Sequence, residues 1–209
     1  MKHVFLLCIF AFFMLSCGEE SKPTPEKKTI QPAKTNGNLL IPVSANNEWT
    51  YERTEYPIYG KGEIVKTTAK CYLQKTHDYY FDDKRQKSFA RYKLFSDNEM
   101  ATPLFLSLRE FFINQDTLIL QGFLRKEELL YIYDKNNLPQ LDYEFGIEYN
   151  YKVDDLQFDT VYTVKNYSHD KSFKYFAKGV GLIHEEYYWN VDGIYKLQDE
   201  YKIKSAVLK

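Results

Sequence analysis

The amino-acid sequence predicts a mainly β fold, in which one antiparallel sheet forms a single domain with at most one short helix. The first observation is composition. The 209-residue chain contains 19 Tyr and 15 Phe, and aromatic side chains suit the half-buried surface of a pleated sheet. The second is spacing, because clusters of Gly, Asp and Asn separate short runs of alternating apolar and polar residues. This pattern is typical of strands joined by tight turns.

Alternation and turn signals place a series of short strands along the chain. Their expected ranges are 48–53, 64–73, 79–81, 88–95, 117–123, 129–133, 149–153, 160–164, 172–177, 182–189 and 194–203. The second of these strands carries Cys71 on the same face as Ala69 and Leu73. We therefore interpret Cys71 as a small buried apolar residue rather than a reactive thiol.

Residues 102–112 fit two structures. As a helix, this segment would gather large apolar side chains on one face, namely Leu104, Phe105, Leu108, Phe111 and Phe112. Thr102 would then cap the helix and Pro103 would occupy its first turn. A strand accommodates the same residues, so the sequence leaves both alternatives open.

The N-terminus has the three parts of a secretory signal peptide. Lys2 precedes a wholly apolar run at residues 4–15, which is shorter than the roughly 20 residues needed to span a bilayer. Small residues follow at Ser16-Cys17-Gly18. Here the chain resembles a bacterial lipoprotein precursor, whose lipobox ends in a small residue and a cysteine, although Met14 replaces its usual first Leu. The alternative is an ordinary cleaved signal in which Cys17 is incidental.

The lipoprotein resemblance implies that residues 1–16 are removed and that Cys17 receives the lipid. A triacylated cysteine would be a lasting membrane anchor, because two or more acyl chains hold a protein on a bilayer. Gly18 is not the Asp that retains some lipoproteins at the inner membrane, so the resemblance implies the outer membrane. Glu19-Glu20 resembles the acidic export tag of Bacteroidota surface lipoproteins, but a solvated linker explains it equally well. The periplasmic or surface side stays undetermined.

Residues 17–38 are expected to form a disordered tether. They combine Pro23, Pro25 and Pro32 with charged and polar residues and contain one large aliphatic side chain, Ile30. Such a composition buries too little apolar surface to offset the entropy of ordering. Residues 39–209 follow without a second linker and are long enough for one domain with its own core.

Two segments resemble the paired signatures of uncharacterised envelope lipoproteins. They are Asn47-Glu48-Trp49-Thr50-Tyr51-Glu52 near the domain start and the stretch at residues 175–183 near its end. The resemblance implies a strongly curved antiparallel sheet, similar to the half-barrel of the LolA and LolB lipoprotein carriers. Gly179 and Gly181 fit that expectation, because glycine permits the bulges and bends of curved sheets.

Candidate catalytic and metal-binding patterns are weak. Residues 184–188 begin like a zinc-protease helix but have Tyr188 in place of the second histidine. His77-Asp78 and His169-Asp170 could be two halves of a metal site, although solvated turn residues explain them more simply. The sequence also lacks a G-x-S-x-G nucleophile turn. We predict no cofactor, no metal and no catalytic residues.

The expected function is binding rather than catalysis. Charges are balanced, with 28 basic and 29 acidic side chains, so the concentrated positive surface that nucleic acid requires is not expected. The surplus of large apolar groups favours a lipid-anchored binding or assembly module for an apolar ligand or a partner protein. An envelope hydrolase with an unrecognised site and a passive surface spacer are the alternatives.

Overall fold

The computed structural model describes residues 28–32, 41–42, 44, 46–83, 86–107, 109–114, 117–122, 143–167 and 171–209. The signal peptide, Cys17, the rest of the tether and the expected strand at 129–133 lie outside the described residues. The statements about them remain predictions. Residues 28–32, which belong to the expected tether, are described and contact the domain.

The described residues form ten strands, a single-turn 3₁₀ helix (η1) and a four-residue α-helix (α2). Their bounds are β1 Glu48–Glu55, β2 Val65–Asp82, β3 Lys87–Ser96, η1 Glu99–Ala101, α2 Leu104–Ser107, β4 Arg109–Asn114, β5 Thr117–Gly122, β6 Tyr143–Val153, β7 Leu156–Asn166, β8 Lys171–Ala177, β9 Gly181–Val191 and β10 Ile194–Val207. The predicted mainly β class is confirmed.

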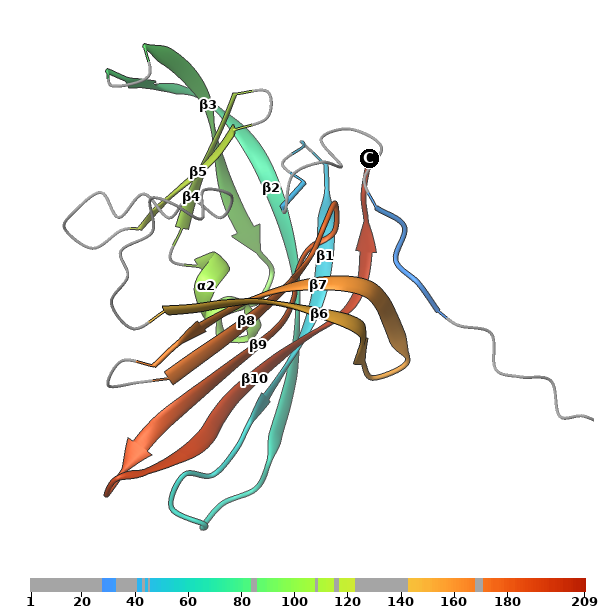
Figure 1. The fold of residues 1–209 in the computed structure, drawn as a ribbon, viewed down its shortest axis with the longest axis vertical. Coiled ribbons are helices and arrows are strands. Elements are labelled where there is room, and N and C mark those ends of the chain that lie inside the picture. Colours follow the sequence, from blue (N-terminus) through green and yellow to red (C-terminus); the bar gives the residue numbers. More distant parts are fainter. Residues whose placement is uncertain are drawn as a thin grey trace, which may run out of the picture.

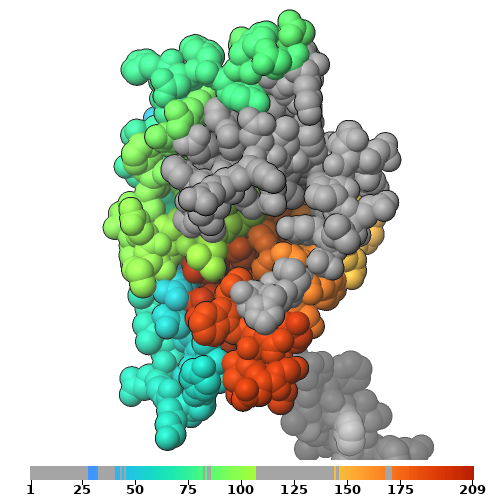
Figure 2. Space-filling model, turned by 90° about the vertical axis from the view of Figure 1, so that its left-hand side faces the viewer, coloured from blue at the N-terminus to red at the C-terminus, as the bar shows by residue number. Residues whose placement is uncertain are grey.

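All ten strands belong to one sheet in the order β5-β4-β3-β2-β1-β10-β9-β8-β7-β6. Each neighbouring pair is antiparallel. The sheet is open, with β5 and β6 at its edges, and it is strongly curved (Figure 1). The β1–β2 turn (blue-green) and the tip of the β9–β10 hairpin (red) lie at one end of the molecule, as the view turned by 90° also shows (Figure 2).

Four register shifts interrupt the ladders. They lie at Thr50/Tyr51, Lys75/Tyr79, Tyr175/Phe176 and Leu197/Asp199. A bulge bends its strand and increases the local twist. The shift at Lys75/Tyr79 explains why β2 continues through residues 79–81, which the sequence pattern treats as a separate strand. The long strand bends at this position instead of ending there.

The ambiguous segment 102–112 contains both predicted structures in succession. Helix α2 ends at Ser107, and strand β4 begins at Arg109. Thr102 does not cap α2, because its hydroxyl donates to the carbonyl of Asn98. The Phe105 N–H instead donates to both carboxylate oxygens of Glu185, at 3.2 and 3.1 Å. A buried side chain from β9 therefore holds the first turn of the helix against the sheet.

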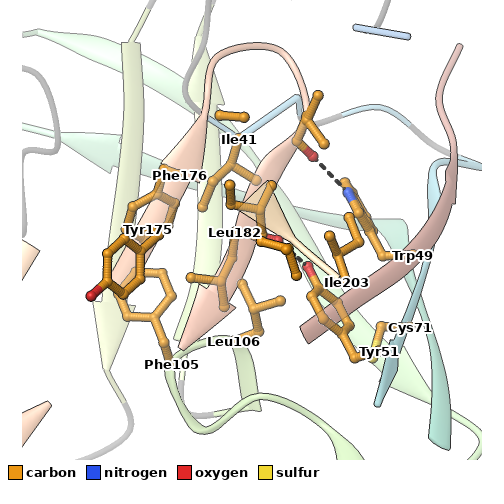
Figure 3. Packing of buried hydrophobic residues seen from close by; sticks show 14 of the residues in the cluster. Ile41, Trp49, Tyr51, Cys71, Phe105, Leu106, Tyr175, Phe176, Leu182 and Ile203 are labelled. Carbon is orange, nitrogen blue, oxygen red and sulfur yellow. Dashed lines mark hydrogen bonds between the residues drawn. The ribbon is translucent and has the colours of Figure 1, made fainter. Parts of the chain in front are cut away.

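The apolar core lies between the sheet and α2 (Figure 3). Ala69, Cys71 and Leu73 are all buried on one face of β2, as the alternation predicts. The Cys71 sulfur lies near the hydroxyls of Ser96 and Thr102, and burial raises the pKa of its thiol. The prediction of a structural rather than reactive cysteine fits this environment.

Two aromatic side chains of β1 reach across β10 to the neighbouring hairpin (Figure 3). The Trp49 indole donates to the Val180 carbonyl at 2.7 Å, and the Tyr51 hydroxyl donates to the Leu182 carbonyl at 2.8 Å. Both side chains are buried. The two segments that resemble envelope-lipoprotein signatures are therefore in direct contact, although they lie at opposite ends of the domain.

Gly179 and Gly181 lie at the turn between β8 and β9. Their φ angles are +72° and +108°, which is a backbone region that favours glycine. A Cβ atom on Gly181 would also lie 3.5 Å from the Trp49 indole nitrogen. The two glycines thus reverse the chain under Trp49, and the nearby bulge at Tyr175/Phe176 belongs to the strand before the turn.

We expect Tyr51→Phe to lower the free energy of unfolding by about 1–3 kcal/mol, because the buried Leu182 carbonyl would lose its hydrogen-bond donor. Urea denaturation followed by the fluorescence of the chain's tryptophans would measure this. Tyr59→Phe is a matched control, since Tyr59 is 75% exposed and its loss of a hydroxyl should change stability by less than about 0.5 kcal/mol. Equal stabilities of the two variants would contradict the proposed tie.

Candidate functional site

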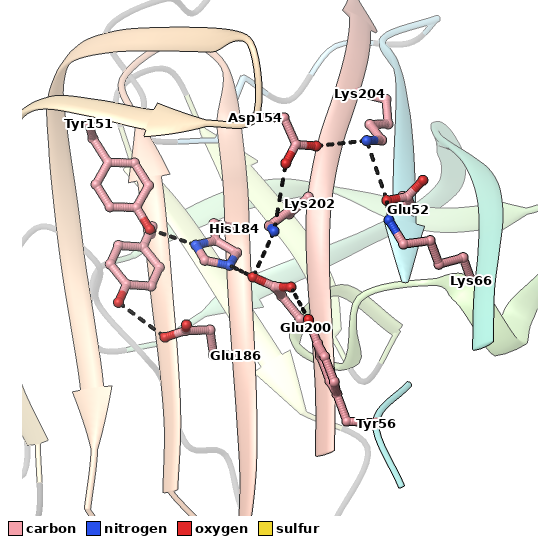
Figure 4. Close-up of polar contacts among 11 residues, drawn as sticks. Glu52, Tyr56, Lys66, Tyr151, Asp154, His184, Glu186, Glu200, Lys202 and Lys204 are labelled. Carbon is pink, nitrogen blue, oxygen red and sulfur yellow. Dashed lines mark hydrogen bonds and ion pairs between the residues drawn. The ribbon is translucent and has the colours of Figure 1, made fainter. Parts of the chain in front are cut away.

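The strongest concentration of interacting polar groups lies on the face of β8–β10 opposite α2 (Figure 4). We call it the polar cluster. It comprises Tyr56, Tyr151, Tyr175, His184, Glu186, Glu200 and Lys202. These residues come from β6, β8, β9, β10 and the start of the β1–β2 connection, so the folded sheet assembles the cluster from distant parts of the chain.

Strand register brings the charged members together. His184 is opposite Lys202, and Glu186 is opposite Glu200. Since alternate residues of a strand share a face, all four side chains project on the same side of the sheet. Glu185, between His184 and Glu186, points to the other side and contacts Phe105. The neighbouring carboxylates at 185 and 186 therefore face opposite sides of the sheet.

His184 joins a tyrosine to a carboxylate. Its Nδ1 lies 2.6 Å from the Tyr151 hydroxyl, and its Nε2 lies 3.1 Å from Glu200 Oε1. Glu200 is ionised at neutral pH and must accept this bond, so Nε2 carries the proton. In the neutral imidazole, Nδ1 then accepts from the Tyr151 O–H. His184 and Glu200 are both buried, which keeps this chain of hydrogen bonds away from bulk water.

Glu200 is the most strongly stabilised carboxylate of the polar cluster. Besides His184, it accepts from the Tyr56 hydroxyl at 2.9 Å and pairs with the Lys202 ammonium at 3.0 Å. The hydrogen bond from His184, followed by those from Lys202 and Tyr56, lowers the pKa of Glu200 to about 2 despite burial. Such hydrogen bonds favour the charged form of a carboxylate.

The tyrosines of the polar cluster remain protonated. Burial raises the pKa of Tyr56 to about 12, with a further contribution from its bond to Glu200. Burial and the negative charge of Glu186 also raise the pKa values of Tyr151 and Tyr175 well above 10. A neutral phenol donates hydrogen bonds but is a poor nucleophile. This arrangement therefore suits orientation of neighbouring groups better than covalent catalysis by tyrosine.

The turn between β6 and β7 adds an ion-pair network beside the polar cluster. Asp154 lies 3.6 Å from Lys202 and 2.7 Å from Lys204. Lys204 also pairs with Glu52, which in turn contacts Lys66. Lys202 is thus shared between Asp154 and Glu200 (Figure 4). The network ties the β6–β7 turn to β10 and β1.

A second candidate site is a groove where β10 and β7 extend beyond their pairing with β9 and β8. The register of β10 with β9 ends at Lys202, and that of β7 with β8 begins only at Val161. Residues 28–32 lie beside the diverging ends (Figure 1, blue), with one parallel bridge from Lys28 to Leu156. An open groove of about 750 Å³ is lined by residues 28–31, Leu156 and residues 204–208. A smaller one of about 360 Å³ lies on the β7 side.

The described core offers far less space than the groove. A void bounded by Trp49, Tyr51, Leu106 and other core residues has a volume of only about 10 Å³. Ligand pockets typically measure about 300–1,000 Å³. Among the described cavities, only the grooves beside residues 28–32 reach that range.

Only some of the residues that the sequence suggested as metal ligands lie in the described part of the chain. Asp78 pairs with Arg91 at 2.9 Å, whereas His169-Asp170 lies outside the described residues. The zinc-protease pattern at 184–188 is on strand β9 rather than a helix. Sequence reasoning missed the partnership of His184 with Glu200, Tyr56, Tyr151 and Lys202. The alternation of His184 and Glu186 was a usable signal, but their partners depend on a bulge at Leu197/Asp199.

Comparisons with known proteins give little further guidance. No family model matches the chain, and no curated protein matches it. A similar solved structure is the crystal structure of a "putative lipoprotein" from Parabacteroides distasonis, a member of the Bacteroidota, with 10% sequence identity and a TM-score of 0.38. The match covers 81% of this chain and 99% of the other. At these values the likeness establishes neither a shared family nor a shared function.

None of the helices in the described part of the chain is long and apolar enough to cross a bilayer.

We expect Glu200 to make stability depend on acidity below neutral pH. Its pKa is lowered to about 2 in the folded chain, from an ordinary value of 4.5, so the folded state favours its ionised form. This stability is present above about pH 5 and is lost as pH falls toward 2. Denaturation at pH 7 and pH 3 should show a smaller loss in Glu200→Gln than in the unaltered protein. Identical pH dependences would refute the assignment.

Proposed function

We propose that this protein is a lipid-anchored module of the bacterial envelope that binds a partner protein without catalysis. The observation that carries the proposal is the open groove beside residues 28–31 and the end of β10. It has the volume of a ligand site, and it lies next to the segment through which the tether would leave the domain. We further propose the outer membrane as its location, on the grounds of the lipobox-like sequence and Gly18.

An extended segment of a protein suits the groove better than an apolar small molecule does. Two strand ends, those of β7 and β10, border the groove beyond their pairing with β8 and β9. Exposed strand edges bind extended peptides through main-chain hydrogen bonds, in the mode known as β-augmentation. The lining mixes Lys28, Gln31 and Lys204 with Ile30 and Leu156, whereas a lipid carrier would require a large apolar cavity.

Contact between residues 28–32 and β7 also shortens the free tether. The backbone N–H of Gln157 donates to the Lys28 carbonyl at 3.4 Å, and Lys28 pairs with Asp155 at 2.5 Å. If Cys17 is the lipidated terminus, residues 18–27 alone would separate the anchor from this contact. Such a segment spans at most about 35 Å. The groove would then lie close to the membrane, within reach of a partner embedded there.

The hydrolase alternative lacks a supporting observation in the described residues. Tyr151, which contacts His184, has a raised pKa and would be a weak nucleophile. The absence of catalysis nevertheless remains a proposal, and a purified activity that is lost on substitution of His184 would overturn it.

For the anchor, we expect Cys17→Ala to abolish lipid attachment without unfolding the domain. Cys17 is the expected acylation site, and the described core is built from residues 41–208 with only Ile30 added from the N-terminal segment. Intact-mass measurement of the membrane-extracted protein would show the acyl mass in the unaltered protein only. A variant that still required detergent for extraction would argue against Cys17 as the anchor.

For the groove, we expect a photo-crosslinking residue at position 207 to capture one envelope protein in cells. Val207 lines the groove and is 56% exposed. Ile194 is a matched control, because it is an aliphatic residue of the same strand, is 64% exposed and lies outside the groove. Peptide mapping should place the crosslink from position 207 within a single extended segment of the partner.

The outcome distinguishes the alternatives. Equal capture at positions 207 and 194 would contradict binding in the groove. Reproducible lipid in organic extracts of the purified protein, without a protein crosslink, would favour an apolar ligand. If neither a protein crosslink nor lipid is found, the passive spacer is the remaining alternative.

A further inference from the structure

We propose that His184, Glu186 and Glu200 form a binding site for a divalent metal ion such as Zn²⁺. Each residue offers one ligand atom, and these atoms all lie within 4.8 Å of one another. His184 and Glu200 are buried, and Glu186 is half-buried. The three side chains project from β9 and β10 on the same face, so the ladder between the two strands fixes their relative positions.

The donor set matches the chemistry of a transition-metal site. Imidazole nitrogen and carboxylate oxygen bind Zn²⁺ at about 2.0–2.2 Å in a tetrahedral arrangement, so two ligand atoms of one ion lie about 3.4 Å apart. The observed separations require only a small closure of side chains around an ion. Three protein ligands would leave at least one coordination position of the ion open to water.

Each proposed ligand is held from behind by a tyrosine hydroxyl. Tyr151 contacts His184 at 2.6 Å, and Tyr175 donates to Glu186 at 3.2 Å. The third bond runs from Tyr56 to Glu200 at 2.9 Å. Hydrogen-bond partners of this kind orient metal ligands. For His184 in particular, Tyr151 lies at Nδ1 and Nε2 is directed at Glu200, so Nε2 faces the proposed ion once its proton has moved to Nδ1.

The charges around the site favour a cation. Glu186 and Glu200 are directly opposite each other on adjacent strands, and like charges in such positions destabilise a sheet. Lys202 supplies one compensating charge at 3.0 Å from Glu200 Oε1. Because Lys202 also lies 3.6 Å from Asp154, it can release Glu200 to a metal ion and keep a carboxylate partner.

Metal binding at Nε2 requires a change of tautomer in His184. The ring proton that Nε2 donates to Glu200 in the described structure moves to Nδ1 and is donated to the oxygen of Tyr151. The Tyr151 hydroxyl then donates its proton to another acceptor, and the neighbouring Tyr175 hydroxyl can accept it. The proton that leaves Nε2 stays on the ring at Nδ1, so the change of tautomer itself releases no proton.

The test is calorimetric titration of the purified full mature protein with Zn²⁺ alone, after treatment with a chelator. We expect one bound ion per chain and a rise in Tm on binding. Glu186→Gln, which removes a ligand charge, should weaken binding by more than about tenfold, and Tyr175→Phe should weaken it by about 10–100-fold through loss of the supporting hydroxyl. Lys202→Met should tighten binding, because it removes the competing ammonium.

Glu148→Gln is the matched control. Glu148 is a half-buried carboxylate of β6 near the same tyrosines but is not among the three ligands, so its variant should bind Zn²⁺ as the unaltered protein does. No binding to the unaltered protein would overturn the proposal. So would binding that survives Glu186→Gln and Tyr175→Phe and is unaffected by Lys202→Met, since that ion would lie elsewhere on the surface. If Glu186→Gln fails to fold, Tyr175→Phe and Lys202→Met still decide the question.

Discussion

Two hydrogen bonds across strand β10 hold the curvature on which the rest of the structure depends. Trp49 and Tyr51 of β1 donate to the carbonyls of Val180 and Leu182, past the intervening strand. In a flat sheet, the backbones of β1 and β9 would lie two strand spacings apart, nearly 10 Å. The large aromatic side chains of β1 bridge this distance because they lie over the concave surface of the sheet. The bonds therefore join the beginning and end of the domain and define the side that α2 covers.

Strand β9 then divides two roles between its faces. Glu185 points into the core and accepts from the backbone of Phe105, so it positions the helix that closes the concave side. His184 and Glu186 point the other way and belong to the polar cluster with Glu200. The same alternation that makes β9 a structural strand presents two candidate metal ligands at a spacing of two residues. Support of the core and assembly of the polar cluster are thus built on one element.

The open groove has a different origin, since it arises where neighbouring strands have unequal lengths. The β8–β9 turn at Gly179 reverses the chain, so that the start of β7 and the end of β10 extend beyond their pairing with β8 and β9. Residues 28–32 lie beside the exposed strand ends and make a single bridge at Lys28. A partner strand could form more main-chain bonds there than this short segment does. The proposed binding function and the route of the tether toward the membrane consequently meet at one place.

The sequence by itself determined the β class, most strand positions and the buried role of Cys71, because alternation and turn residues are local properties. It could not choose between helix and strand at residues 102–112, where Glu185, distant in the chain, holds the first turn of α2. Nor could it find the polar cluster. The Asp192-Gly193 hairpin alone would place Asp199 opposite Glu186, but a bulge at Leu197/Asp199 shifts the register by one residue and places Glu200 there. Only tertiary structure decides such a shift, since a one-residue slip exchanges the two faces of a strand.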